Sequence, residues 1–195
     1  MRKNTLSEQV SYVEKMSNFI KNLNVKQIEK IVDGYISNAV IASELNFDWL
    51  QIHGAHGYFL SLLMSPEINK RQDKYNCQDI LFIRKIVEGI RDNSIQIKID
   101  IRISLVEGLK NVEEEIIDKR GLISNLVKLR FDMISFSNGL YDYDKKMIYP
   151  DASDGFLPMY KHASFFLENY PNIMWNLSGN VNDILKIKNF RFMII

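Results

Sequence analysis

The sequence predicts an α/β fold in which helices alternate with parallel β-strands. Segments of strand length that are rich in β-branched residues alternate with segments of helical period, and this alternation is typical of βαβ units. The 195 residues contain 46% hydrophobic and 25% charged side chains, which is the ordinary range for a globular protein. No low-complexity linker interrupts the chain, so we expect residues 1–195 to form a single domain.

Five strands are predicted from short apolar runs. The clearest is residues 95–104, where Ile97, Ile99, Ile101 and Ile103 alternate with polar positions. The predicted strands cover residues 47–52, 95–104, 131–136, 173–176 and 190–195.

Helices are predicted from apolar positions at helical spacing. In the first, Leu6, Val10, Val13 and Ile20 share one face, and Asn24 is a plausible N-cap for the second. The predicted helices cover residues 6–23, 25–39, 79–90, 112–129, 159–169 and 181–187. A loop rich in Asp, Tyr, Pro and Gly is predicted over residues 137–158.

Charge and cysteine content exclude several classes of protein. There are 25 basic and 24 acidic residues, so the net charge of +1 provides no field for nucleic acid or an anionic membrane surface. Cys77 has no second cysteine to pair with, which suits a reducing compartment. No apolar run approaches the ~20 residues of a membrane span, and the N-terminal residues do not form a signal-peptide stretch. We therefore expect a soluble cytoplasmic protein.

The most informative segment follows the first predicted strand. His53, His56 and Tyr58 stand within I-H-G-A-H-G-Y, and the carboxyl ends of parallel strands carry the site in α/β barrels. Two imidazoles three residues apart can donate two hydrogen bonds to one carbonyl or nitro oxygen and so polarise a conjugated alkene. The phenol of Tyr58 could then deliver a proton to the α-carbon.

Two other interpretations of these side chains remain open. His53 and His56 could be ordinary structural histidines. They could also be part of a metal site with His162 or an aspartate as a further ligand, although His-x-x-His alone falls short of the three or four ligands that a metal needs.

The motifs around this segment resemble a known family. F-D-W-L-Q-I-H-G-A-H-G-Y at residues 47–58, followed by Ser65-Pro66, Asn69, Arg71, Asp73 and Tyr75, is similar to the middle of the barrel in old yellow enzymes. These are FMN-dependent ene-reductases that take hydride from NADH or NADPH. The resemblance implies that His53 and His56 bind the activating oxygen of an enone-like small molecule and that Tyr58 is the proton donor. It implies no metal, nucleic acid or membrane.

Two further segments resemble parts of the family's flavin site. Ile101 to Ser104 resembles a strand end whose arginine contacts the flavin near N1 and O2, which gives that role to Arg102. The alternative is a strand-end arginine that pairs with an acidic neighbour such as Asp100. Ser178, Gly179 and Asn180 resemble the loop at the flavin phosphate, where a helix N-terminus suits an anion. A simple turn is equally compatible with these three residues.

The resemblance covers only part of the barrel. It runs from about Leu23 to the end and corresponds to the fourth to eighth strands, so the expected fold is a partial TIM (β/α) barrel with an extra N-terminal helix. The first three strands and a phosphate-binding Gly-Arg pair have no counterpart, and the family's Gly-Gly-Ser turn after Tyr75 is replaced by Asn76-Cys77-Gln78.

Two functions are therefore predicted. One is an FMN-dependent oxidoreductase that reduces activated C=C bonds, and the other is an inactive or partner-dependent remnant that has lost its flavin site. A partial barrel exposes two strand edges. The chain could be a degenerate gene product, one piece of a split gene, or a compact relic that dimerises. We thus expect a homo-oligomer or a partner that supplies the missing strands.

Overall fold

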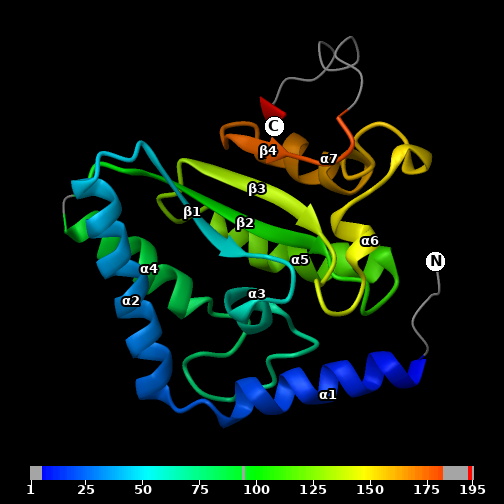
Figure 1. The fold of residues 1–195 in the computed structure, drawn as a ribbon, viewed down its shortest axis with the longest axis horizontal. Coiled ribbons are helices and arrows are strands. Elements are labelled where there is room, and N and C mark those ends of the chain that lie inside the picture. Colours follow the sequence, from blue (N-terminus) through cyan, green and yellow to red (C-terminus); the bar gives the residue numbers. More distant parts are fainter. Residues whose placement is uncertain (1–5, 94, 182–192, 195) are drawn as a thin grey trace.

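A five-stranded parallel sheet forms the centre of the computed structural model, which describes residues 6–93, 95–181 and 193–194 (Figure 1). Neighbouring strands are all parallel, and their order in the sheet follows their order in the chain, as in a (β/α) barrel. The strands are β1 (Trp49–Gly54), β2 (Lys98–Val106), β3 (Met133–Asn138), β4 (Trp175–Leu177) and β5 (Met193–Ile194). All five predicted strands are confirmed in position, although residues 190–192 and 195 lie outside the described residues.

Helices follow or precede these strands as the periodicity predicts. They are α1 (Leu6–Asn22), α2 (Val25–Glu44), α3 (Phe59–Met64), α4 (Leu81–Asp92), α5 (Val112–Leu126), α6 (Lys145–Ile148) and α7 (Tyr160–Asn169). Asn24 caps α2 as predicted, in a reciprocal capping box with Gln27. The predicted helix over residues 181–187 lies almost wholly outside the described residues.

One short helix and the interior of one loop differ from the prediction. Helix α3 was not expected, because residues 60–64 are all buried and so show no polar face from which a helical period could be read. The predicted loop over residues 137–158 contains α6 and a turn of 3₁₀ helix, Ala152–Asp154. Among the described helices, none is long and apolar enough to cross a lipid bilayer.

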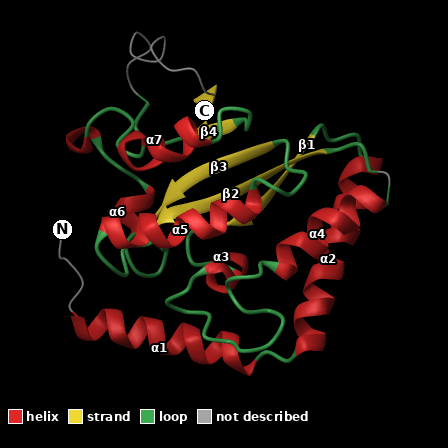
Figure 2. Cartoon of the chain, turned by 180° about the vertical axis from the view of Figure 1, so that it is seen from behind, coloured by secondary structure: helices red, strands yellow, loops and turns green. Residues whose placement is uncertain are grey.

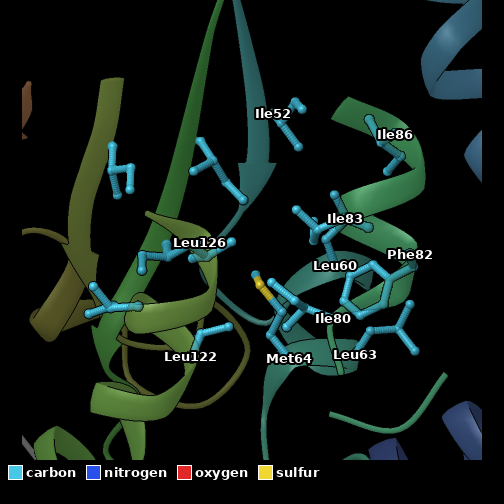
Figure 3. Close-up of a cluster of buried hydrophobic side chains, with 14 of the residues drawn as sticks. Ile52, Leu60, Leu63, Met64, Ile80, Phe82, Ile83, Ile86, Leu122 and Leu126 are labelled. Atoms are coloured by element: carbon cyan, nitrogen blue, oxygen red, sulfur yellow. The ribbon is translucent and has the colours of Figure 1, made fainter. Parts of the chain in front are cut away.

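Helices α4 and α5 cover one face of the sheet, and α2 packs on α4 (Figures 1 and 2). The core lies between this face and the helices. Figure 3 shows how side chains from β1, α3, α4 and α5 interdigitate there. Each fully buried aliphatic side chain contributes roughly 1.5–3 kcal/mol to folding. Members of this cluster include Ile52, Leu60, Leu63, Met64, Ile80, Phe82, Ile83, Ile86, Leu122 and Leu126.

The opposite face of the sheet carries a row of polar side chains, one from each of four neighbouring strands. We call this row, which consists of Gln51, Asp100, Ser135 and Asn176, the polar layer. Gln51 on β1 and Ser135 on β3 both donate to Oδ2 of Asp100 on β2, Ser135 at 2.7 Å, and Asn176 on β4 donates to Ser135 Oγ at 3.0 Å. Asp100 is 2% exposed, and burial raises its pKa. Oδ1 of Asp100 and Oδ1 of Asn176 are buried without a hydrogen-bond partner.

The motif residues between Ser65 and Tyr75 connect the N-terminal helices to the loop after α3. Nη1 of Arg71 donates to the backbone carbonyls of Ile20 at 2.7 Å and Leu23 at 2.6 Å, and its guanidinium also pairs with Asp73. The side chain of Asn69 donates to two further backbone carbonyls nearby. These motif residues therefore fix the junction of α1 and α2 against the loop after α3.

Candidate active site

The turn after β1 places His56 in a left-handed conformation. Its φ is +63° and that of Gly57 is +78°, a region that glycine adopts freely and histidine only occasionally. The backbone N–H of His56 donates to Ser104 Oγ at 2.9 Å, and its carbonyl accepts from the N–H of Tyr141 at 2.8 Å. These bonds to β2 and to the segment after β3 hold the imidazole in place at the carboxyl end of the sheet.

Three aromatic side chains meet at this end. The ring centroids of His53 and His56 are 5.1 Å apart, and those of His53 and Tyr58 are 5.2 Å apart. Tyr58 is the N-cap residue of α3 and is 50% exposed. The structure therefore brings together the imidazole pair and the phenol that the sequence singled out.

Arg102 lies beside them on the neighbouring strand. It pairs with His53 in the register of β1 and β2, so both are on the same rim. Its Nη2 donates to Ser137 Oγ at 3.1 Å and Ser178 Oγ at 3.4 Å, while its Nε is buried without a partner. Among the described residues no ion pair joins Arg102 to Asp100, although the Asp100 carboxyl acts electrostatically on the guanidinium and partly offsets the effect of burial on the pKa of Arg102.

Ser137 is a site residue that the sequence analysis missed. Its hydroxyl lies 2.6 Å from Nε2 of His56 and also accepts from Arg102, so it connects the imidazole to the guanidinium. A serine in a strand carries no distinctive signal. Only the register of β3 against β2 shows that it reaches these two groups.

Burial and positive charge keep both imidazoles neutral. Burial, then the charge of Arg102, lowers the pKa of His56 to about 4 and also lowers the pKa of His53. Burial likewise lowers the pKa of Arg102, and a guanidinium remains protonated in proteins. At pH 7 each imidazole therefore has one N–H to donate and one nitrogen that accepts.

The turn after β4 contains Gly179 and Asn180, both with positive φ, +112° and +50°. The side-chain amide of Asn180 donates to the carbonyls of Asp151, at 2.8 Å, and Gly155. Gly179 and Asn180 therefore form a turn that this side chain holds to the segment before α7. Their assignment to the flavin phosphate stays a prediction, because the helix expected to follow lies outside the described residues.

His162 lies in a different place from the imidazole pair. It lines a pocket of about 350 Å³ beside the carboxyl ends of β3 and β4, together with Asn138 and Ser178. Among residues 6–93 and 95–181, no group of three or more His, Cys, Asp or Glu side chains is arranged to hold a metal ion.

A parallel α/β sheet whose strands follow chain order, with imidazole, phenol and guanidinium groups on its carboxyl rim, places the chain in the (β/α)-barrel class. Sequence comparison gives the family. A model of the NADH:flavin oxidoreductase / NADH oxidase family matches residues 2–147, and the chain belongs to this family. The match includes α1, which the motif resemblance alone did not cover.

Curated relatives agree with this assignment. The chain is 29% identical over 140 residues to an NADH oxidase of Thermoanaerobacter brockii, covering 67% of this chain and 20% of the relative. It is 29% identical over 123 residues to an NADPH dehydrogenase of Bacillus pumilus, covering 60% and 35%. It is 34% identical over 108 residues to a probable NADPH dehydrogenase of Candida albicans, covering 51% and 26%. The matched region thus spans between a fifth and about a third of each of these relatives.

Solved structures show the same fold. A 2-naphthoyl-CoA reductase complex aligns over 88% of this chain and 27% of its own, with a TM-score of 0.71 and 15% identity. A morphinone reductase variant with tetrahydroNAD aligns over 88% and 46%, with a TM-score of 0.61 and 16% identity. These similarities confirm the α/β fold of partial-barrel type.

Family membership implies FMN as the cofactor and NADH or NADPH as the hydride donor, and Arg102 tests whether this chain fits FMN. Among the described residues its guanidinium donates to the neutral hydroxyls of Ser137 and Ser178, and its Nε is buried without a partner. A partly buried guanidinium whose Nε–H is buried without an acceptor has room for an electron-rich partner, such as the pyrimidine edge of a flavin. The donor set on this rim therefore fits the cofactor.

Proposed function

We propose that this chain provides the substrate-activating part of an FMN-dependent oxidoreductase that reduces activated C=C bonds. The observation that carries the proposal is the placement of His53, His56, Tyr58 and Arg102 on one rim of the sheet. We further propose that residues 1–195 form a single partial-barrel domain.

Each side chain has a role that its position supports. Arg102 would hold the pyrimidine edge of FMN, with Gly179 and Asn180 near its phosphate. The chemistry that FMN would supply there is hydride transfer from NADH or NADPH to the alkene. His53 and His56 donate hydrogen bonds to the substrate's carbonyl or nitro oxygen, which draws electron density from the alkene. Tyr58, half exposed beside His53, donates the proton to the α-carbon.

Substitution of Tyr58 by phenylalanine tests the proton-donor role. Tyr58→Phe should leave reduction of the flavin by NAD(P)H unchanged, because that step needs no proton from the phenol. It should slow reoxidation by an enone roughly 10²-fold or more, as expected for the loss of a general acid. Stopped-flow absorbance separates the two half-reactions. Tyr141→Phe is the matched control, because it changes a neighbouring phenol whose ring centroid is 6.3 Å from that of Tyr58. Equal slowing of both half-reactions by Tyr58→Phe would reject the assignment.

A flavin titration distinguishes the two predicted functions. FMN should bind the wild-type chain more tightly than Arg102→Ala, in which the guanidinium is lost. The alternative of an inactive remnant gains support if no flavin reduction occurs in the wild type with FMN present. Because β1 is an edge strand of the sheet, we also propose that the chain associates with itself or with a partner through this edge.

A further inference from the structure

The hydroxyl of Ser137 lies between the imidazole of His56 and the guanidinium of Arg102. Its Oγ is 2.6 Å from Nε2 of His56 and 3.1 Å from Nη2 of Arg102. Ser137 is 2% exposed, so water does not compete freely for this oxygen. The positions of hydrogens at this junction decide which nitrogen of His56 can act on a ligand.

The hydrogens at this junction can be assigned by counting donors and acceptors. A serine hydroxyl has one hydrogen and two lone pairs, and an arginine can only donate. Arg102 therefore takes one lone pair of Ser137, and Nε2 of His56 is the acceptor within reach for the hydroxyl hydrogen. If Nε2 carried the proton instead, the hydroxyl hydrogen would be buried without an acceptor, which is unfavourable.

We infer that Ser137 is a positioning residue that fixes His56 in the tautomer protonated at Nδ1, so that Nδ1–H is the hydrogen-bond donor of this imidazole. The part of the inference that concerns a substrate oxygen rests on the proposed function. The tautomer itself does not. Since one hydroxyl binds both groups, it also fixes the imidazole relative to the guanidinium of Arg102.

Surrounding contacts restrict His56 to this arrangement. Its backbone is held by Ser104 and Tyr141 in the left-handed turn, which fixes the Cα from which the ring reaches Ser137. The imidazole is neutral at pH 7 because burial and Arg102 lower its pKa to about 4. A neutral ring has one N–H, and the hydroxyl of Ser137 determines which nitrogen carries it.

Long-range ¹H–¹⁵N correlation spectra of the full chain at pH 7 test the inference directly. The chain has only three histidines, so His53→Gln and His162→Gln variants assign the His56 signals. We expect Nε2 of His56 at the shift of an unprotonated imidazole nitrogen and Nδ1 at that of a protonated one. A wild-type spectrum with Nε2 protonated would overturn the inference.

Variants of Ser137 give the second readout. Ser137→Ala should shift the ratio of the two His56 tautomers toward Nε2–H by roughly threefold to tenfold, the effect of one lost hydrogen bond. Ser137→Thr keeps the hydroxyl and should restore the wild-type ratio. Ser135→Ala removes a hydroxyl two residues earlier that bonds Asp100 and Asn176, so it should leave the ratio unchanged. An unchanged ratio in Ser137→Ala would refute the role, and if that variant fails to fold, the wild-type and Ser137→Thr spectra decide.

Addition of FMN and 2-cyclohexenone separates this inference from the proposed function. If Nδ1 is protonated and its signal shifts when both compounds are present, the inference and the function are both supported. If Nδ1 is protonated but its signal never responds, the tautomer assignment stands and the proposed function fails. If the ligands are bound while Nε2 carries the proton, the inference is wrong and the function is retained.

Discussion

The loop after β2 depends on one buried carboxylate, and its removal provides a sharp test of how the rim is built. Glu115 in the first turn of α5 is 5% exposed. Its two oxygens accept from four consecutive backbone N–H groups, those of residues 107–110, at distances of 2.5, 3.1, 2.6 and 2.9 Å. This carboxylate therefore fixes the segment that immediately follows the strand bearing Arg102.

Glu115→Gln should destabilise the fold by about 3 kcal/mol. The amide retains one oxygen that can accept two of the four bonds, while its NH₂ group faces the other two N–H groups. Losing two hydrogen bonds to a charged acceptor costs roughly 1.5–3 kcal/mol each, and relaxation of the loop toward water recovers part of this. With a slope of about 2–3 kcal/mol per molar urea, the unfolding midpoint should fall by roughly 1–1.5 M.

Glu114→Gln is the matched control, because Glu114 is exposed and its side chain is adjacent in the same helical turn. It loses only its interaction with the helix N-terminus and should change stability by less than about 0.5 kcal/mol. Urea unfolding followed by tryptophan fluorescence and circular dichroism measures both variants. If Glu115→Gln unfolds at the same urea concentration as Glu114→Gln, the four hydrogen bonds do not hold the loop and the reasoning fails.

Three further predictions concern the site and the open edge. The pKa of His56, lowered from 6.5 to about 4, means that the unfolded chain binds more protons than the folded chain between these values. Lowering the pH through this window should therefore destabilise the wild type relative to His56→Gln by ~1–2 kcal/mol, and the same pH dependence in both proteins would exclude this. Gly57→Ala should lower stability by ~1–3 kcal/mol in thermal unfolding, because φ is +78° and a Cβ would lie 2.8 Å from the hydroxyl of Tyr12; wild-type stability would disprove the strain. Phe47 is 60% exposed beside the edge strand β1, so Phe47→Lys should weaken concentration-dependent association in sedimentation, and a monomeric wild type would contradict the proposal.

The strands and long helices could be predicted because their apolar side chains recur at strand or helix spacing where they pack in the core. Ile99, Ile101 and Ile103 alternate because alternate side chains of β2 meet the helices. Strand β1 begins at Trp49 instead of Phe47 and continues to Gly54, because its ends are set by pairing with β2 and not by its own composition. Such pairing partners are distant in the chain and leave no local pattern.

The residues of the candidate site that lie within one short motif could be predicted, and those that come from distant strands could not. His53, His56 and Tyr58 stand within six residues, so their proximity follows from one turn. Ser137 is 81 residues from His56, and its contact depends on the register of two strands. Whether His53 and His56 bind a substrate oxygen is a property of a complex, so that role stays a prediction.

The polar layer also constrains how this sequence can change over evolutionary time. Ser135 donates to Asp100 and accepts from Asn176, so loss of its hydroxyl removes a partner from both at once. Loss of the Asp100 carboxylate would in turn leave Gln51 and Ser135 without their acceptor. Single substitutions here should therefore be deleterious although the corresponding multiple substitution is tolerated. These four positions should show epistasis, and the order in which they change should decide which sequences are accessible.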